Sequence, residues 1–143
     1  MENIKTFVVD ASIALKSILN EEGSNQAAKL IAEKENYKIS VLVPEIFVYE
    51  FLNTLTRKYD EESALKLYEQ YCMVQLSIVH FETDIIEEAA KIVKKYEKIS
   101  FYDASYHALA KVYKTQFITA DEKYYELTKA EGDVKLLSEL KLS

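Results

Sequence analysis

Four acidic residues occupy positions from which a carboxylate could bind a metal ion. Asp10 and Asp121 each follow a short apolar run that is typical of a β-strand, and a helical pattern begins directly after each of them. Glu50 lies on the same side of a predicted helix as its apolar residues, and Asp103 lies in the first turn of another. Because an acid beside an apolar stripe is costly unless it is paired or binds a metal, the pattern favours a shared site.

Other metal-binding residue types are scarce. The sequence contains one cysteine, Cys72, and two histidines, His80 and His107. One cysteine excludes an intrachain disulfide and a cysteine-based metal cage, and two histidines are too few for a histidine site. Carboxylate oxygens are the ligands that Mg²⁺ and Mn²⁺ prefer, so we expect a bound metal to be held by oxygen. Cys72 is expected to belong to the core.

Each of these acids, taken singly, also has a structural explanation. Asp10 and Asp121 could cap the helices that follow them, and Asp103 could complement a helix dipole. Glu50 could be an ordinary acid on a helix surface. Four acids, each at a strand end or a helix face, form a pattern that favours function, but the residues alone leave both explanations open.

The acids must be positioned by strands that alternate with helices. The first strand is apolar throughout, which is typical of burial on both faces in a parallel sheet. Because strand–helix–strand units make right-handed crossovers, the alternation predicts an α/β fold, a three-layer α/β/α sandwich with a central, mostly parallel sheet of four or five strands. The predicted strands are 7–10, 39–43, 75–81, 115–119 and 134–137, and the predicted helices are 12–20, 24–35, 45–59, 60–71, 83–93, 100–112 and 121–127.

Several residues mark where these elements begin and meet. Pro44 is expected as the first residue of its helix, Ser100 as the cap of another, and Thr83 or Asp84 as the cap of a third. If the first and fourth strands are neighbours in a parallel sheet, the acids that follow them meet at one edge, where ligands bind in open α/β sheets.

Size and charge limit what the chain could do. Its 143 residues fit one domain, and we expect residues 1–143 to form it. No apolar run approaches the ~20 residues that span a bilayer, and residues 1–5 lack the features of a signal peptide, so we expect a cytoplasmic protein with no membrane partner. The net charge of −6 argues against a simple nucleic-acid-binding module and fits an enzyme that binds cations, or a protein with a basic partner.

The sequence resembles a PIN domain, in particular the small single-domain VapC-type ribonuclease toxins. Four stretches match the family in order and spacing, and together they extend over nearly the whole chain: 8–16 (VVDASIALK), 43–55 (VPEIFVYEFLNTL), 101–110 (FYDASYHALA) and 117–121 (FITAD). Any one of them is a modest signal, whereas four in order are a strong one.

The resemblance implies which residues form the site. The family's catalytic and metal-binding acids fall on Asp10, Glu50, Asp103 and Asp121. Its supporting polar positions fall on Ser12, Asn53 and Thr119. Glu45 precedes the matching glutamate and sits in a first helical turn, where we interpret it as a partner of the helix dipole.

The resemblance also implies metal-assisted hydrolysis of phosphodiester bonds. One or two Mg²⁺ or Mn²⁺ ions held by the acids would activate water and neutralise charge on the phosphate. RNA is the implied substrate, and Lys16, Arg57 and Lys58 are candidates for contacts to its phosphates. The protein is then the toxin of a toxin–antitoxin pair, with a basic antitoxin as partner, or a solitary PIN-domain nuclease in RNA processing.

Three functions outside this family are alternatives for this chain. A non-catalytic acidic interaction domain is the alternative of a different class, and metal binding discriminates against it. A haloacid-dehalogenase-like phosphotransferase needs a second aspartate where this chain has Ser12. A small Rossmann-type nucleotide binder is disfavoured because no glycine-rich loop follows the first strand.

Assembly is indicated by the tyrosines, of which there are 11. Tyrosine supplies amphipathic contact area that suits interfaces, although the rim of a core would also explain it. We expect the apolar, tyrosine-rich surface on helices 45–73 to pair two copies as a homodimer through a two-fold interface.

Overall fold

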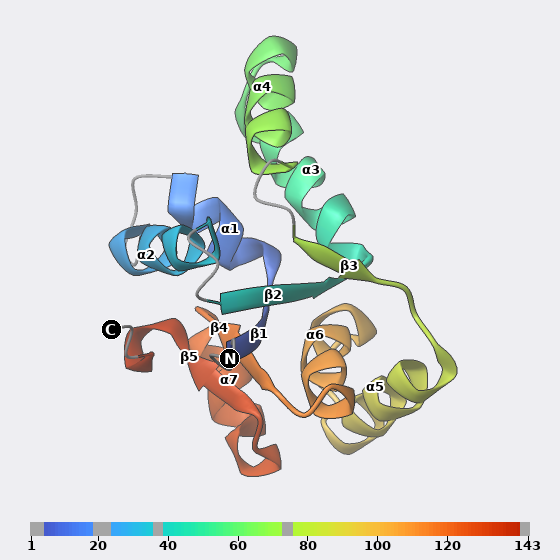
Figure 1. The fold of residues 1–143 in the computed structure, drawn as a ribbon. Helices are drawn as coiled ribbons and strands as arrows, with labels where there is room; N and C mark the ends of the chain where they lie inside the picture. Colours follow the sequence, from blue (N-terminus) through green and yellow to red (C-terminus); the bar gives the residue numbers. More distant parts are fainter. Residues whose placement is uncertain (1–4, 19–23, 36–38, 73–75, 141–143) are drawn as a thin grey trace.

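The computed structural model of the chain describes residues 5–18, 24–35, 39–72 and 76–140. Strands and helices alternate along these residues (Figure 1). The strands are β1 (Lys5–Val9), β2 (Ile39–Pro44), β3 (Ser77–Val79), β4 (Gln116–Thr119) and β5 (Val134–Leu136). The helices are α1 (Ala11–Ile18), α2 (Ser24–Glu35), α3 (Ile46–Lys58), α4 (Glu61–Cys72), α5 (Thr83–Lys95), α6 (Phe101–Val112) and α7 (Glu122–Thr128), with the 3₁₀-helices η1 (Lys129–Glu131) and η2 (Leu137–Glu139).

The five strands form one sheet in the order β3-β2-β1-β4-β5, and every neighbouring pair is parallel. β1 is the central strand, and its last three residues, Phe7, Val8 and Val9, are buried. The prediction of an α/β/α sandwich around a parallel sheet is confirmed, with five strands rather than four. The expected neighbourhood of the first and fourth strands is confirmed as well, because Val9 pairs with Ile118.

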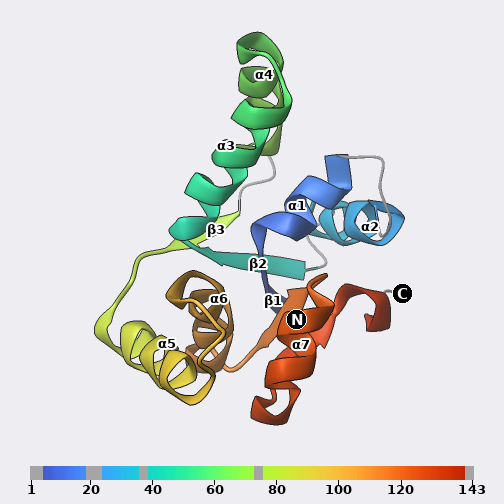
Figure 2. The same cartoon turned by 180° about the vertical axis from the view of Figure 1, so that it is seen from behind.

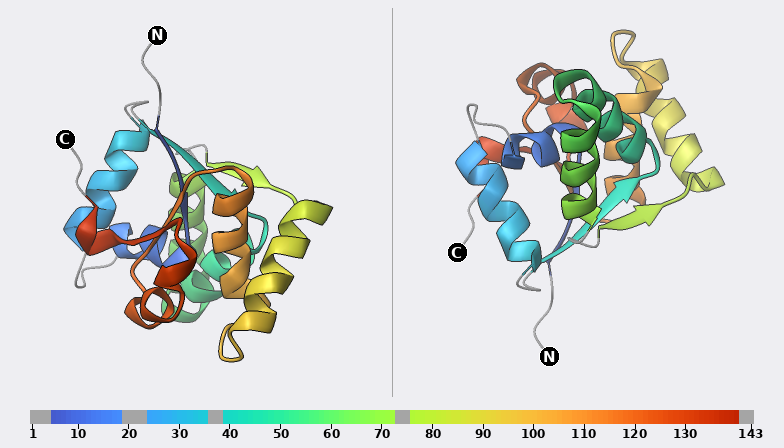
Figure 3. Two further views of the ribbon diagram at one scale, coloured as in Figure 1. Left: turned by 90° about the horizontal axis from the view of Figure 1, so that it is seen from below. Right: turned by 90° about the horizontal axis from the view of Figure 1, so that it is seen from above.

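Helices cover both faces of the sheet. Figure 1 shows α1, α2, α3 and α4 above the sheet and α5, α6 and α7 below it, and Figure 2 shows the same division from behind. In the view from below, α5, α6 and α7 lie in front of the strands, while α3 and α4 lie behind them (Figure 3). The arrangement follows from right-handed crossovers, because the chain first winds outward from β1 to β3 and then returns to the other side of β1.

This winding creates a topological switch point between β1 and β4. The chain leaves β1 for α1 on one face of the sheet and leaves β4 for α7 on the opposite face. The two connections therefore diverge at the carboxyl ends of the two strands, which is the position where open α/β sheets bind ligands.

The start of α3 differs from the prediction. Pro44 is the last residue of β2, in register with Val79 of β3, and α3 begins at Ile46. Glu45 contacts the β3 edge, where its Oε1 accepts a hydrogen bond from the backbone N–H of Phe81 at 2.9 Å. β3 ends at Val79, opposite the last residue of β2, and is therefore shorter than the predicted strand 75–81. Residue 75 lies outside the described ranges.

Helix caps agree with the sequence in one case and differ in another. The Ser100 side chain accepts a hydrogen bond from the Asp103 backbone N–H at 3.1 Å and caps α6, as predicted. The N-cap of α5 is Glu82, whose side chain makes no capping bond, so the prediction of Thr83 or Asp84 is wrong. The Cys72 side chain lies outside the described part of the structure. None of the helices in the described ranges is long and apolar enough to cross a membrane.

Candidate active site

Asp10 lies at the carboxyl end of β1, at the turn into α1. Its Oδ1 accepts hydrogen bonds from the Ser12 hydroxyl and from the backbone N–H of Ile13 (3.2 Å). Its Oδ2 accepts a bond from Thr119 Oγ1 of β4 (2.8 Å). Asp10 therefore caps α1, as its structural explanation required, and at the same time lies at the switch point.

Thr119 connects Asp10 to Asp121. Its buried hydroxyl donates to Asp10 and accepts a hydrogen bond from the backbone N–H of Asp121 at 3.0 Å. The Oδ1 of Asp121 accepts from the backbone N–H of Tyr124 at 3.0 Å and so caps α7. Both aspartates thus have a capping role and are held across the β1–β4 pair by one threonine.

Glu50 is held by a residue that the sequence analysis missed. The Tyr106 hydroxyl of α6 donates to Glu50 Oε1 of α3 at 2.5 Å. Tyr106 follows Asp103 by three residues, so the two side chains share one face of α6. That spacing is the signal that could have identified it, although nothing in the sequence indicates that Glu50 lies opposite.

The electrostatics of the site join the four predicted acids into one cluster. Burial raises the pKa of Asp10, and the charge of Asp103 raises it further, against the three hydrogen bonds that lower it. Burial also raises the pKa of Glu50, with added repulsion from Asp103 and Asp10. The pKa of Asp103 is raised first by burial and then by the charge of Asp121. Each of the four acids takes part in at least one of these repulsions, so a bound cation would stabilise the site.

Not all predicted supporting and rim residues lie at the cluster. Ser12 and Thr119 bind Asp10 directly. Asn53 is exposed on α3, where its side-chain oxygen accepts a hydrogen bond from Arg57 Nε (3.2 Å). Lys16 lines a hollow of about 170 Å³ together with Ala120, the residue before Asp121. Of the three basic residues considered for phosphate contacts, Lys16 is therefore the one with a demonstrated place beside the β4–α7 turn.

The donor set suits a hydrated divalent ion. Within the described ranges, no group of three or more His, Cys, Asp or Glu side chains is arranged closely enough to form a metal cage. Mg²⁺ rarely needs such a cage, because it keeps several waters and commonly binds one or two carboxylates directly. Clustered carboxylates whose pKa values are raised by burial and by one another fit that requirement.

The fold and the site define the class of this protein, a parallel α/β sandwich with acidic residues at its switch point. Comparison of the chain with models of protein families identifies the family. The PIN domain model matches residues 7–130, so the chain belongs to the PIN-domain family. No curated protein matches the chain.

Solved structures with the same fold include a VapC toxin and a toxin–antitoxin complex. VapC20 of Mycobacterium tuberculosis, described as a Sarcin-Ricin loop cleaving toxin, is 20% identical with a TM-score of 0.68, over 90% of this chain and 96% of that one. FitAcB of Neisseria gonorrhoeae is 16% identical with a TM-score of 0.71, over 94% and 99%. A toxin–antitoxin complex of Klebsiella pneumoniae is 16% identical with a TM-score of 0.68, over 93% and 98%. At these identities the likeness establishes the fold.

Proposed function

We propose that this chain is a metal-dependent endoribonuclease that hydrolyses phosphodiester bonds of RNA and acts as the toxin of a toxin–antitoxin pair. The observation that carries the proposal is that four acids from four separate segments repel one another in pairs, and that Thr119 links two of them, Asp10 and Asp121, across the β1–β4 pair. A structural role for each acid would account for the two caps. It would not account for carboxylates packed so that they repel one another.

Some residues of the site would hold the metal ion, and others would orient these ligands. Asp10, Glu50, Asp103 and Asp121 would hold one or two Mg²⁺ or Mn²⁺ ions. Such an ion supplies Lewis-acid stabilisation of charge on the phosphate and lowers the pKa of water. Thr119 and Ser12 donate hydrogen bonds to Asp10, which oppose the rise of its pKa caused by burial and hold its oxygens in place. Both hydroxyls are engaged by Asp10, which would itself hold a metal ion, so we assign to both a role in orienting the site and not that of the nucleophile.

A basic protein partner fits the same site. The net charge of −6 and the mutually repelling carboxylates favour a partner that presents Arg or Lys to these acids, which would form charge-assisted hydrogen bonds and block RNA. Among the solved structures of this fold are VapBC2 of Rickettsia felis, bound to a fragment of promoter DNA, and the Klebsiella complex of toxin and antitoxin. An antitoxin is accordingly the partner that we propose for this chain.

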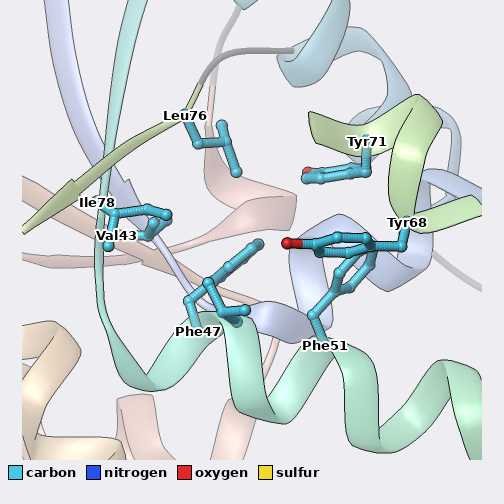
Figure 4. Close-up of a pocket in the computed structure, with 8 residues that line it drawn as sticks. Val43, Phe47, Phe51, Tyr68, Tyr71, Leu76 and Ile78 are labelled. Carbon is cyan, nitrogen blue, oxygen red and sulfur yellow. The ribbon is translucent and has the colours of Figure 1, made fainter. Parts of the chain in front are cut away.

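We further propose that α3 and α4 carry the interface of a homodimer. An apolar pocket of about 110 Å³ lies where α3, α4 and β3 meet. Figure 4 shows Phe47, Phe51 and Ile78 among the side chains that line it. On the same two helices, Tyr49 of α3 is 70% exposed and Leu65 of α4 is 56% exposed. Exposed apolar side chains are typical of association surfaces when they form a patch.

The nuclease proposal is tested by metal binding and cleavage together. Titration of the metal-free protein with Mn²⁺ should give saturable binding that Asp10→Asn weakens, and a pool of random-sequence RNA should be cut only when Mg²⁺ or Mn²⁺ is present. Metal binding without any RNA cleavage would favour a non-catalytic acidic domain. RNA cleavage would favour a solitary RNA-processing nuclease if the gene of this chain has no gene for a small basic protein beside it.

A further inference from the structure

The hydrogen bond between Tyr106 and Glu50 links the two helices that carry site acids from opposite faces of the sheet. Tyr106 belongs to α6, and it donates to Glu50 Oε1 of α3 at 2.5 Å. Among the described residues, none donates a hydrogen bond to the other oxygen, Oε2. One oxygen of Glu50 is thus occupied by a protein donor, while the other is available to a ligand.

The donor itself is fixed by packing. Tyr106 is 1% exposed, and its ring stacks on Phe117 of β4 with centroids 5.7 Å apart and planes 13° from parallel. The backbone N–H of Ala11, the residue after Asp10, also approaches the Tyr106 hydroxyl. The hydroxyl therefore has a defined position between the β1–α1 turn and α3, set by the core and not by the acids.

A hydrogen-bond donor to Glu50 matters because the charges of the neighbouring acids favour a position of its carboxylate outside the cluster. The carboxylate is repelled by Asp103 and by Asp10, and α3 is exposed on the neighbouring side at Tyr49. A glutamate side chain has enough freedom to turn its carboxylate toward solvent, where repulsion is screened. The bond from Tyr106 opposes that movement.

We propose that Tyr106 is a positioning residue that holds Glu50 in the acidic cluster and presents its second oxygen to the metal ion. The inference rests on the proposed function, because it gives Glu50 a cation to bind. Partners of metal ligands typically change metal affinity or activity by about 10–100-fold when they are removed. Tyr106 meets the description of such a partner: it touches the ligand, does not itself bind the cation, and is held rigidly by the core.

The test compares Tyr106→Phe with Tyr96→Phe. Tyr96 makes the same type of bond, from its hydroxyl to Glu131 Oε1 at 2.7 Å, but at the α5–η1 contact, away from the acids. We expect Tyr106→Phe to weaken Mn²⁺ binding, measured by titration calorimetry without RNA, by about tenfold. Tyr96→Phe should leave Mn²⁺ affinity within twofold of wild type. In cleavage assays, the lower activity of Tyr106→Phe should recover in large part at saturating Mn²⁺, which loss of folded protein would not do.

A double-mutant cycle assigns the effect to Glu50. In a Glu50→Gln background, Tyr106→Phe should have no further effect on Mn²⁺ affinity, because the ligand it positions is gone. If Tyr106→Phe does not fold, Glu50→Asp is the second variant; it keeps the charge, withdraws the carboxylate from the hydroxyl, and should weaken Mn²⁺ binding similarly. Wild-type affinity in Tyr106→Phe, or equal losses in Tyr106→Phe and Tyr96→Phe, would overturn the inference and leave the nuclease proposal standing. Absence of Mn²⁺ binding by the wild type would overturn both.

Discussion

Replacing Glu50 by glutamine removes one charge from the cluster and keeps the shape of the side chain. The Oε1 of glutamine can still accept the hydrogen bond from Tyr106, so that contact is preserved in kind. The burial of the carboxylate and its repulsion by Asp103 and Asp10, which raise the pKa of Glu50, are relieved. We therefore expect Glu50→Gln to stabilise the metal-free protein near neutral pH.

The magnitude follows from opposing contributions. Each of the two repulsions contributes about 0.2–1 kcal/mol after solvent screening, and relief of burial adds to them. Against this, the bond from Tyr106 changes from a charge-assisted one (about 1.5–3 kcal/mol) to a neutral one (about 0.5–1.5 kcal/mol). These two contributions nearly cancel, so the relief of burial, which is the largest cause of the raised pKa of Glu50, decides the sign. We expect a net gain on the order of 1 kcal/mol or less, which raises the melting temperature by up to roughly 3 °C for a chain of this size.

The assay is thermal melting in EDTA and in Mn²⁺, with Glu131→Gln as the matched control. Glu131 also accepts a tyrosine hydroxyl bond, but Lys95 and Tyr96 hold the pKa of its carboxyl below the usual value. Glu131→Gln should therefore melt lower than wild type, whereas Glu50→Gln should melt higher in EDTA and gain less from Mn²⁺. If Glu50→Gln melts lower in EDTA and gains as much from Mn²⁺ as wild type, Glu50 is an ordinary structural acid and the reasoning is refuted.

The remaining predictions concern pH, catalysis, assembly and inhibition. Because folding raises the pKa values of Asp10, Glu50 and Asp103, their contribution to metal-free stability should be fully present below their unfolded pKa values and be lost as pH rises through the folded values. Chemical denaturation of wild type and Glu50→Gln across this range tests the loss, and Mn²⁺ should cancel it. Asp121→Asn should keep the α7 cap, since asparagine caps equally well, yet lose metal-dependent RNA cleavage by at least about 100-fold; undiminished cleavage would contradict its place in the site. Light scattering at tens of micromolar should give twice the chain mass of 16.5 kDa, and a value near 16.5 kDa would contradict the homodimer. A bound antitoxin should cover the four acids and abolish RNA cleavage. A complex that still cuts RNA would contradict that mode of inhibition.

The order of elements, and the places of Asp10 and Asp121 at the ends of strands, could be read from the chain alone. An apolar run such as Phe7–Val9 has one stable environment, the interior of a parallel sheet, and a carboxylate that follows it must emerge at the strand's end. The caps at Asp10, Ser100 and Asp121 are equally local, because each needs only a short side chain and the next turn of helix. Local rules of this kind need no knowledge of which strands are neighbours.

Contacts between distant segments were decided by the tertiary structure. Tyr106 reads as one more core residue of α6 until packing places it opposite Glu50, 56 positions earlier. Thr119 meets Asp10 only because β4 pairs with β1, and Glu45 finds Phe81 only because β3 lies beside β2. The side chain of Asn53, by contrast, accepts a hydrogen bond from Arg57 of its own helix, so this contact does not depend on which strands are neighbours. Sequence specifies which groups are charged and which are buried, but the partner of a buried charge depends on how the sheet is ordered, and that order is set by the packing of the whole chain.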